Sequence, residues 1–572
     1  MGVLVLPDAV SSTGDQKGRS RPAELAVIRG GSPDEHVEHR TLAGSCARSL
    51  GAYYTPPLAT RYMARWALRR GVNRVLEPSM GDGEFLHAVA TEANANGAQV
   101  TLWGVELALD TYRATLQRGV VDTDHAILSD FLAVRPFPVD VAIGNPPYVR
   151  LRHLPPADAE RARTVAAPIL QEAMDPGGSI WMPFVLHAAE FLAPGGRLAF
   201  VLPHDLTYVR YARPLWRHLA ASFGDLRIVR VHERVFPEIL QEVVLLLADQ
   251  RGGTTRGVTF EAFEHRRDLE FGTPISRTTI AIDRITQGER PFLEALLPTD
   301  LRQLLQTTVA SGTRPVRDLA TFNIGYVCGD KRFFHPEPAT VEKYELPVSS
   351  LVPALTSSRR IRATGLFTSQ LPPEGVDNLF LPPMNEEALT LGEHRYITKG
   401  RRDGVHKGYK ASVRKPWYVT PGVKRPDLIV PVFADRPLLL INDGEYAASN
   451  SLLTGYLTPQ GSVDAIAASW YTSLTLLQVE LNVHSLGGGV MIFVPQEAGS
   501  IRLTRGVSAR GQLRHVDKFL RAGKIEEAYR AGDSLVLSKQ LRLTTEQVEL
   551  VRGGVDILRH WRTARSRPGD VG

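Results

Sequence analysis

A tetrapeptide, Asn145-Pro146-Pro147-Tyr148, directly follows an apolar run at residues 139–144. We expect that run to be a buried strand, and open α/β sheets hold their ligands at the carboxyl ends of strands. Asn145 offers an amide oxygen, and the prolines lack an N–H, so backbone carbonyls of this segment stay available as acceptors. Tyr148 adds a flat face on which a ring can stack. Such a site would accept hydrogen bonds from an exocyclic amine and hold its ring still. Methylation of an amide-like nitrogen demands this, because the lone pair of that nitrogen is delocalised. For the tetrapeptide alone, a proline-stiffened turn is the alternative.

A glycine turn lies upstream, between a predicted strand at 74–77 and a helix that begins at Glu84. Gly81 and Gly83 would let the backbone approach a ligand closely, and the helix N-terminus offers free amides. The third glycine of a dinucleotide fingerprint is missing, and there is no Walker lysine, so ATP is not expected. A plain tight turn is the alternative for this motif.

Acidic residues stand at successive strand ends. Glu77 ends the first predicted strand and Glu106 the second, where a carboxylate can accept both hydroxyls of a ribose. Asp130-Phe131 follows the third strand and is placed for an adenine amine and a ring edge. Together these residues predict a nucleoside site built from acids, and S-adenosylmethionine supplies both an adenosine and an activated methyl group.

Short apolar runs alternate with helical stretches between residues 50 and 250. Strands are predicted at 74–77, 100–106, 126–128, 139–143, 197–202 and 243–248. This alternation predicts an α/β fold with a doubly wound, mostly parallel sheet. We divide the chain into a flexible tail (1–45), a catalytic domain (46–255), a connector (256–315), a second, α+β domain (316–505) and a helical C-terminal segment (506–572).

Composition is that of an ordinary soluble globular protein, with 43% apolar and 22% charged residues among 572. No apolar stretch approaches the ~18 residues that span a bilayer, so no membrane partner is expected. The N-terminus lacks the basic residues of a signal peptide. Two distant cysteines, Cys46 and Cys328, imply neither a disulfide framework nor a zinc cluster, so we expect no metal and a cytoplasmic location.

Charge is unevenly distributed. Only Lys17 precedes Lys331 among the lysines, whereas ten Lys/Arg and two acids lie between Glu393 and Pro426. Such a basic stripe is typical of surfaces that neutralise phosphates, with a solvated loop as the alternative. The residues of the stripe that we expect to contact DNA are Lys407, Lys410, Arg414, Lys415 and Trp417.

Taken in their order along the chain, the motifs resemble those of the adenine-N6 DNA methyltransferases of bacterial restriction–modification systems, in the gamma arrangement typified by the TaqI enzyme. The segment 53–57 resembles the N-terminal cofactor motif of that family, which adds Thr55 to the cofactor residues, and Phe184 falls where the family places an aromatic beside the cofactor adenine. Val235-Phe236-Pro237 resembles the motif whose aromatic stacks the flipped base. The resemblance covers residues 50–250 well. The second half shows only a general similarity to target-recognition domains. The similar segments are Ile324-Gly325-Tyr326, Tyr409, Trp417-Tyr418 and Gly487–Gly489.

The resemblance implies a class I S-adenosylmethionine-dependent fold with a target-recognition domain. It implies methyl transfer to N6 of an adenine flipped out of double-stranded DNA, with Tyr148 and Phe236 stacking on the base. Asn145, Pro146, Pro147 and Tyr148 would be the catalytic motif, in which the Asn145 amide oxygen and the Pro146 carbonyl accept the two N6 hydrogens. A monomer is expected, with a cognate restriction endonuclease as a possible partner. Three alternatives remain: methylation of RNA adenine, methylation of a protein glutamine amide, and a DNA-binding protein with an inactive methylase fold.

Overall fold

The computed structural model describes residues 55–69, 71–235, 242–359, 361, 365–434, 436–485, 490–505 and 512–563. All of these residues belong to one compact unit, residues 51–572. The predicted tail (1–45), Phe236 and the glycines at 487–489 lie outside the described residues.

A nine-stranded sheet forms the first half of the described chain, with the strand order β3-β2-β1-β4-β5-β7-β6-β8-β9. Strands β1 to β5 run parallel, and β7 is antiparallel to its neighbours β5 and β6. The predicted doubly wound, mostly parallel sheet is thereby confirmed. The strands are β1 Arg74–Glu77, β2 Thr101–Glu106, β3 Ala126–Leu128, β4 Val139–Gly144, β5 Leu192–Pro203, β6 Phe223–Val231, β7 Val243–Arg251, β8 Gly257–Phe263 and β9 Ser276–Ala281.

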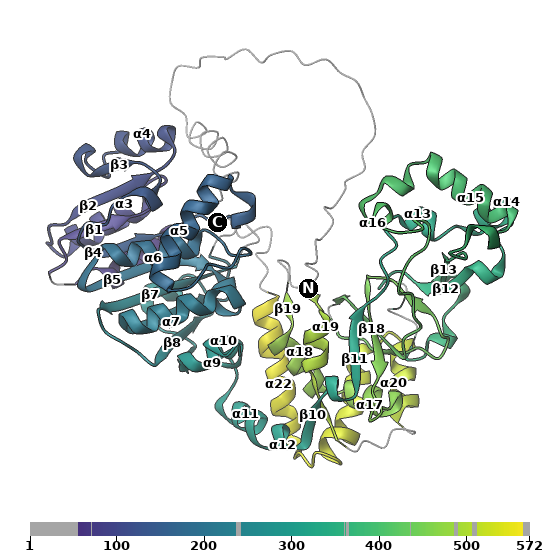
Figure 1. The fold of residues 1–572 in the computed structure, drawn as a ribbon. Coiled ribbons are helices and arrows are strands. Elements are labelled where there is room, and N and C mark those ends of the chain that lie inside the picture. The colour runs from purple at the N-terminus through teal and green to yellow at the C-terminus, as the bar shows by residue number, and fades with distance from the viewer. Residues whose placement is uncertain are drawn as a thin grey trace, which may run out of the picture. The chain divides into compact units, whose positions relative to one another are not determined.

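Helices cover both faces of this sheet (Figure 1). Successive residues of β4 point to opposite faces, so Val141 and Ile143 pack beneath α2 and α3 while Ala142 packs on the other side. Both faces are apolar because both are covered, which is why the central strands read as continuous apolar runs. The helices are α2 Pro57–Ala67 and α3 Glu84–Ala95 on one face, α5 Pro156–Leu170, α6 Trp181–Phe191 and α7 Arg213–Ser222 on the other, and α4 Leu109–Gln117 after β2.

Residues 256–281 extend the sheet, which corrects the predicted start of the connector at residue 256. Strand β8 pairs in parallel with β6, and β9 pairs with β8 at the sheet edge. The edge strand β9 buries only Ile280 well and exposes polar residues, so its sequence lacks the apolar run of a central strand. The helices of this part are α8 Asp268–Phe271, α9 Ile282–Thr286, α10 Pro291–Glu294, α11 Thr299–Leu304 and α12 Ala310–Gly312.

The second half combines several small sheets with helices, as an α+β region should. A four-stranded sheet has the order β11-β18-β14-β16, and the others have two or three strands. The strands are β10 Thr313–Pro315, β11 Ala320–Ile324, β12 Leu351–Leu355, β13 Asp377–Phe380, β14 Leu428–Pro431, β15 Phe433–Ala434, β16 Leu440–Ile441, β17 Ala447–Ala448, β18 Leu452–Leu457, β19 His484–Ser485, β20 Met491–Ile492 and β21 Arg502–Thr504. The helices are α13 Lys331–Phe334, α14 Pro338–Tyr344, α15 Leu391–Arg402, α16 Tyr409–Ser412, α17 Val463–Trp470, α18 Ser473–Asn482 and α19 Pro495–Ser500.

The C-terminal segment is helical, as predicted. It begins with two helices, α20 Gln512–Arg521 and α21 Ile525–Gly532, which are separated at Gly523, a residue in a left-handed conformation (φ 70°). Helix α22 spans Thr545–Arg562 and begins with a capping box between Thr544 and Gln547. None of the described helices is long and apolar enough to cross a membrane.

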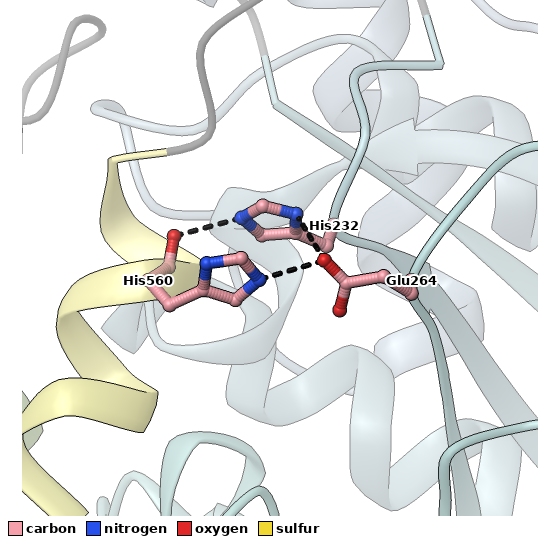
Figure 2. A group of neighbouring side chains, drawn as sticks. All are labelled: His232, Glu264 and His560. Atoms are coloured by element: carbon pink, nitrogen blue, oxygen red, sulfur yellow. Dashed lines mark hydrogen bonds and ion pairs between the residues drawn. The ribbon is translucent and has the colours of Figure 1, made fainter.

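Helix α22 returns to the nine-stranded sheet and contacts it through two histidines and a glutamate (Figure 2). The Glu264 carboxylate lies 3.0 Å from His232 Nδ1 and 2.7 Å from His560 Nε2, and His232 Nε2 is 2.8 Å from the His560 carbonyl. The imidazoles stack with centroids 3.7 Å apart. Both imidazoles therefore meet at one oxygen of the Glu264 carboxylate, and this group forms a hydrogen-bonded joint between α22 and the sheet.

Candidate active site

The tetrapeptide after β4 holds its asparagine between two hydroxyl groups. The Asn145 side-chain nitrogen donates to Thr55 Oγ1 at 3.2 Å, and the Tyr148 hydroxyl donates to Asn145 Oδ1 at 2.5 Å. Both contacts specify the same amide orientation, with Oδ1 toward the tyrosine. The Ser79 hydroxyl, from the turn after β1, donates to the Asn145 main-chain carbonyl at 3.1 Å. Thr55, expected only as a cofactor residue, therefore also touches Asn145.

Tyr148 sits against the carboxyl end of the neighbouring strand. Its hydroxyl lies 3.0 Å from the Val201 carbonyl in β5, and its half-buried ring packs on both apolar cores of the catalytic domain. A phenol has one proton, so it can donate to Asn145 or to Val201 but not fully to both. The side chain therefore has an alternative acceptor ready if Asn145 Oδ1 is engaged elsewhere.

The glycine turn after β1 is shaped as the sequence predicts. Gly81 and Gly83 have positive φ angles of 50° and 80°, which disfavour residues with a side chain. A Cβ at Gly83 would lie 3.0 Å from the Thr115 side chain in α4. The Thr115 hydroxyl in turn donates to the Gly81 carbonyl at 2.5 Å. Helix α4 thus holds the turn from behind and leaves the N-terminus of α3 at the strand ends.

Glu77 is a buried carboxylate whose Oε2 has no hydrogen-bond partner among the described residues. Burial, followed by the charge of Asp82, raises the pKa of Glu77 well above its usual value. Burial, followed by the charge of Glu84, raises the pKa of Asp82 to about 6. Glu77 is buried and Asp82 is half-buried, and their raised pKa values fit a cationic ligand, because a positive charge would favour the ionised form of both. S-adenosylmethionine carries a sulfonium and an ammonium, and these carboxylates would hold them.

Glu106 ends β2 and is fixed by main-chain donors. Its carboxylate accepts from the Gly81 N–H at 3.1 Å and from the Ala108 N–H at 2.8 Å. Strand pairing places Glu77 opposite Gly104, two residues before Glu106, so register brings both acids to one edge of the sheet. Leu107 follows Glu106 and is 65% exposed, although large apolar side chains are usually buried. Leu107, which the sequence did not single out, would be accessible to the adenine of a nucleoside bound at this edge.

Asp130 is held at the end of β3 by two contacts. It caps the following short helix by accepting from the Leu132 N–H at 3.0 Å, and it pairs with Arg161 of α5. Sequence reasoning missed Arg161, since nothing in the spacing of these residues links a helix arginine to a strand-end acid. Phe131 and Phe184 are buried, with ring centroids 5.2 Å apart, and belong to an aromatic cluster with His187 and Phe191. They lie behind Asp130 as a packed support.

A second polar network follows the tetrapeptide. Arg150 donates to the Asp205 carboxylate at 2.9 Å and to the Tyr211 hydroxyl at 3.0 Å. The Tyr208 hydroxyl also donates to Asp205, at 2.7 Å. These contacts join the segment after β4 to the segment after β5 and so fix the two strand ends that carry Asn145 and Val201.

The five predicted DNA-contact residues divide into two groups. Lys407, Lys410 and Lys415 are exposed. Arg414 instead donates to the main-chain carbonyls of Val327 and Cys328, and the Trp417 ring packs on Phe333 with centroids 5.2 Å apart. The lysines therefore face solvent, whereas the arginine and the tryptophan are engaged by the fold.

Comparison with known proteins identifies both halves of the chain. Residues 39–213 match the family model N-6 DNA Methylase, and residues 289–537 match the C-terminal domain of Type II methyltransferase M.Eco57I. The Type II methyltransferase M.PaeR7I of Pseudomonas aeruginosa is 26% identical over 506 residues, covering 77% of this chain and 82% of that protein. M.XhoI of Xanthomonas vasicola is 24% identical over 477 residues, covering 75% and 82% respectively.

Among solved structures, the Type IIL restriction-modification enzyme MmeI in complex with DNA has a similar fold. The TM-score is 0.50 at 10% identity, over 92% of this chain and 76% of that one. The matched family models and the observed fold together identify an S-adenosylmethionine-dependent methyltransferase. Within that class, the matched family models and relatives make the chain an adenine-specific N6 DNA methyltransferase of the restriction–modification type.

Proposed function

We propose that Asn145, Pro146, Pro147 and Tyr148 are the catalytic residues for methyl transfer to N6 of an adenine flipped out of duplex DNA. The observation that carries this proposal is the held amide of Asn145, whose Oδ1 lies beside Tyr148 at the carboxyl end of β4. The chain would act in the gamma arrangement, as the modification enzyme of a restriction–modification system with a cognate endonuclease. We also expect a cytoplasmic monomer.

Catalysis in this proposal consists of holding and polarising N6. The Asn145 oxygen and the Pro146 carbonyl accept the two N6 hydrogens, which localises the nitrogen lone pair for in-line attack on the methyl group. When Asn145 Oδ1 accepts from the adenine, the Tyr148 hydroxyl can turn its proton to the Val201 carbonyl, 3.0 Å away. The extra proton leaves N6 after the transfer, so no general base is required.

The cofactor residues divide by the part of S-adenosylmethionine that they would hold. The cofactor supplies an electrophilic methyl group on a positively charged sulfur. Glu77 and the turn at Gly81 and Gly83 would hold its methionine end. Glu106 would accept the ribose hydroxyls, and Asp130 would accept the adenine amine, with Phe131 and Phe184 packed behind. Thr55 would serve both the cofactor and Asn145.

Methylome mapping tests the proposal directly. The chain is expressed in a host that lacks DNA methylation, and modified adenines are mapped by single-molecule sequencing, with Asn145→Ala as the control. One recurring motif with modified adenine is expected in the wild type, and a strongly reduced fraction of modified adenine at that motif is expected in the variant. A wild-type level of modified adenine with Asn145→Ala would refute the catalytic assignment. Labelling of RNA or protein without labelling of DNA would assign the activity to one of those substrates instead.

A further inference from the structure

Two large apolar side chains stand exposed within the basic stripe. Tyr409 is 76% exposed and Val413 is 66% exposed. Tyr409 begins α16 and Val413 caps it, four residues later, so both lie on one side of this helical turn. We call these two residues the apolar pair. Its carbon atoms face water, although side chains of this type are usually buried.

The helical turn that carries the apolar pair is anchored on its opposite side. Ala411, between the two residues, is buried, at 4% exposure. The Arg414 guanidinium donates to the Cys328 carbonyl at 2.8 Å and also to the Val327 carbonyl, and it lies over the Phe334 ring at 5.7 Å. The helical turn is therefore fixed to the body of the domain, and the apolar pair projects from it without being part of that contact.

Positive charge surrounds the apolar pair. The Lys410 ammonium lies 5.4 Å from the centroid of the Tyr409 ring, and Lys407 and Lys415 are exposed on either side in sequence. Residues 404–426 contain six Lys/Arg and no acid. An anionic partner is thus favoured over a neutral or cationic one.

Duplex DNA is a polyanion that combines phosphates with apolar surface, because base faces and groove walls lie between two charged strands. Aromatic side chains stack on bases without regard to sequence, and apolar side chains that enter a base step open it and bend the duplex. A rigid apolar projection with flanking ammonium groups has the composition that such a contact requires.

We propose that the apolar pair is a DNA-deforming contact. Tyr409, backed by Val413, inserts against the bases of the bound duplex, while Lys407, Lys410 and Lys415 contact the phosphates on either side. This inference rests on the DNA substrate of the proposed function and assigns a role to residues that take no part in methyl transfer.

The test separates the apolar contact from charge. A duplex that carries the mapped methylation motif is titrated with wild type, Tyr409→Ala, Tyr409→Phe and Lys410→Ala at several salt concentrations. We expect Tyr409→Ala to weaken binding about tenfold without changing the salt slope, and Tyr409→Phe to bind like wild type. Lys410→Ala should lower the slope by about one. Val348→Ala is the matched control, since Val348 is 84% exposed outside the stripe.

A second measurement locates the insertion. The fluorescent base 2-aminopurine is placed at successive positions outside the target adenine. Wild type should raise the fluorescence at one of them, and Tyr409→Ala should abolish that rise. Unchanged affinity and fluorescence with Tyr409→Ala would overturn the proposal, as would a change of oligomeric state with DNA binding intact. Failure of the wild type to methylate DNA would instead count against the proposed function.

Discussion

Two regions of the molecule position their side chains differently. The candidate site lies at the strand ends of a buried sheet, whereas the basic stripe of the second half lies on exposed helical turns. At the strand ends, Asn145, Glu77 and Glu106 are placed by the register of buried parallel strands. In the stripe, Lys407 and Lys410 project from two short helical turns into solvent. Methyl transfer needs atoms fixed within a fraction of an ångström, which a buried sheet provides. Phosphate contacts tolerate looser positions, because charge attraction is weakly directional.

The largest effect should follow from removing the held amide. Asn145→Ala deletes one of the two acceptors for N6, so kcat should fall by about 10²- to 10³-fold, the range seen when one preorganised hydrogen bond to a reacting group is lost. Single-turnover methylation measures this. The Kd values for S-adenosylmethionine and for DNA should stay within about twofold. If the affinity for S-adenosylmethionine or DNA fell as much as kcat, Asn145 would be needed for binding and not specifically for methyl transfer.

The next largest effect should come from Glu106. Glu106→Gln keeps the shape and one acceptor but removes the charge, and charge-assisted hydrogen bonds are about twice as strong as neutral ones. We expect the Kd for S-adenosylmethionine, measured by calorimetry, to rise about tenfold, while DNA affinity without cofactor is unchanged. An unaltered cofactor Kd would remove Glu106 from the site.

Cofactor affinity should also depend on pH. A cationic ligand favours ionised carboxylates, and the pKa of Asp82 is raised to about 6 by burial and by Glu84. Affinity for S-adenosylmethionine should therefore fall as the pH drops through about 6, by at most tenfold per unit for one proton. Asp82→Asn should flatten this part of the profile, and the dependence that remains would belong to Glu77. An identical profile in Asp82→Asn would contradict the linkage.

The smallest effects are expected for two residues of the basic stripe, Lys407 and Arg414, and these effects should differ in kind. Lys407→Ala should weaken DNA binding a few-fold and lower the salt slope by about one, with thermal stability unchanged. Arg414→Ala removes a donor from two main-chain carbonyls, so it should lower the Tm by a few degrees. Equal changes in salt slope for both variants would show that Arg414 contacts phosphate after all.

The strands and the strand-end residues of the first sheet could be predicted because their signals are local in the sequence. Strands β1 to β5 and β7 were all predicted from their short apolar runs, and the carboxyl ends of the parallel strands β1 to β5 meet at one edge. Strand β6 was missed, since Asp225, Arg227 and Arg230 interrupt its apolar run. The edge strand β9 was missed because an edge exposes polar residues.

Contacts between distant segments were not predictable from spacing. Arg161 reaches Asp130 from a helix 31 positions away, and Thr55 meets Asn145 across 90 positions. The exposure of individual side chains was also not predictable. The sequence of the basic stripe does not show that Arg414 and Trp417 face the domain while Lys407 and Tyr409 face solvent. Such facts depend on packing between elements, which a single sequence specifies only through the complete fold.

The joint between His232 and His560 links residues 328 positions apart. The ribosome therefore synthesises the whole sheet long before helix α22. During that interval Arg230, which pairs with Glu242 and also donates to the Trp561 carbonyl at 3.3 Å, lacks the second of these acceptors. At an ordinary elongation rate of about 5–20 residues per second, the interval lasts roughly 15 to 70 seconds. The nascent enzyme consequently passes through a stage in which its methylase core is synthesised but not yet closed.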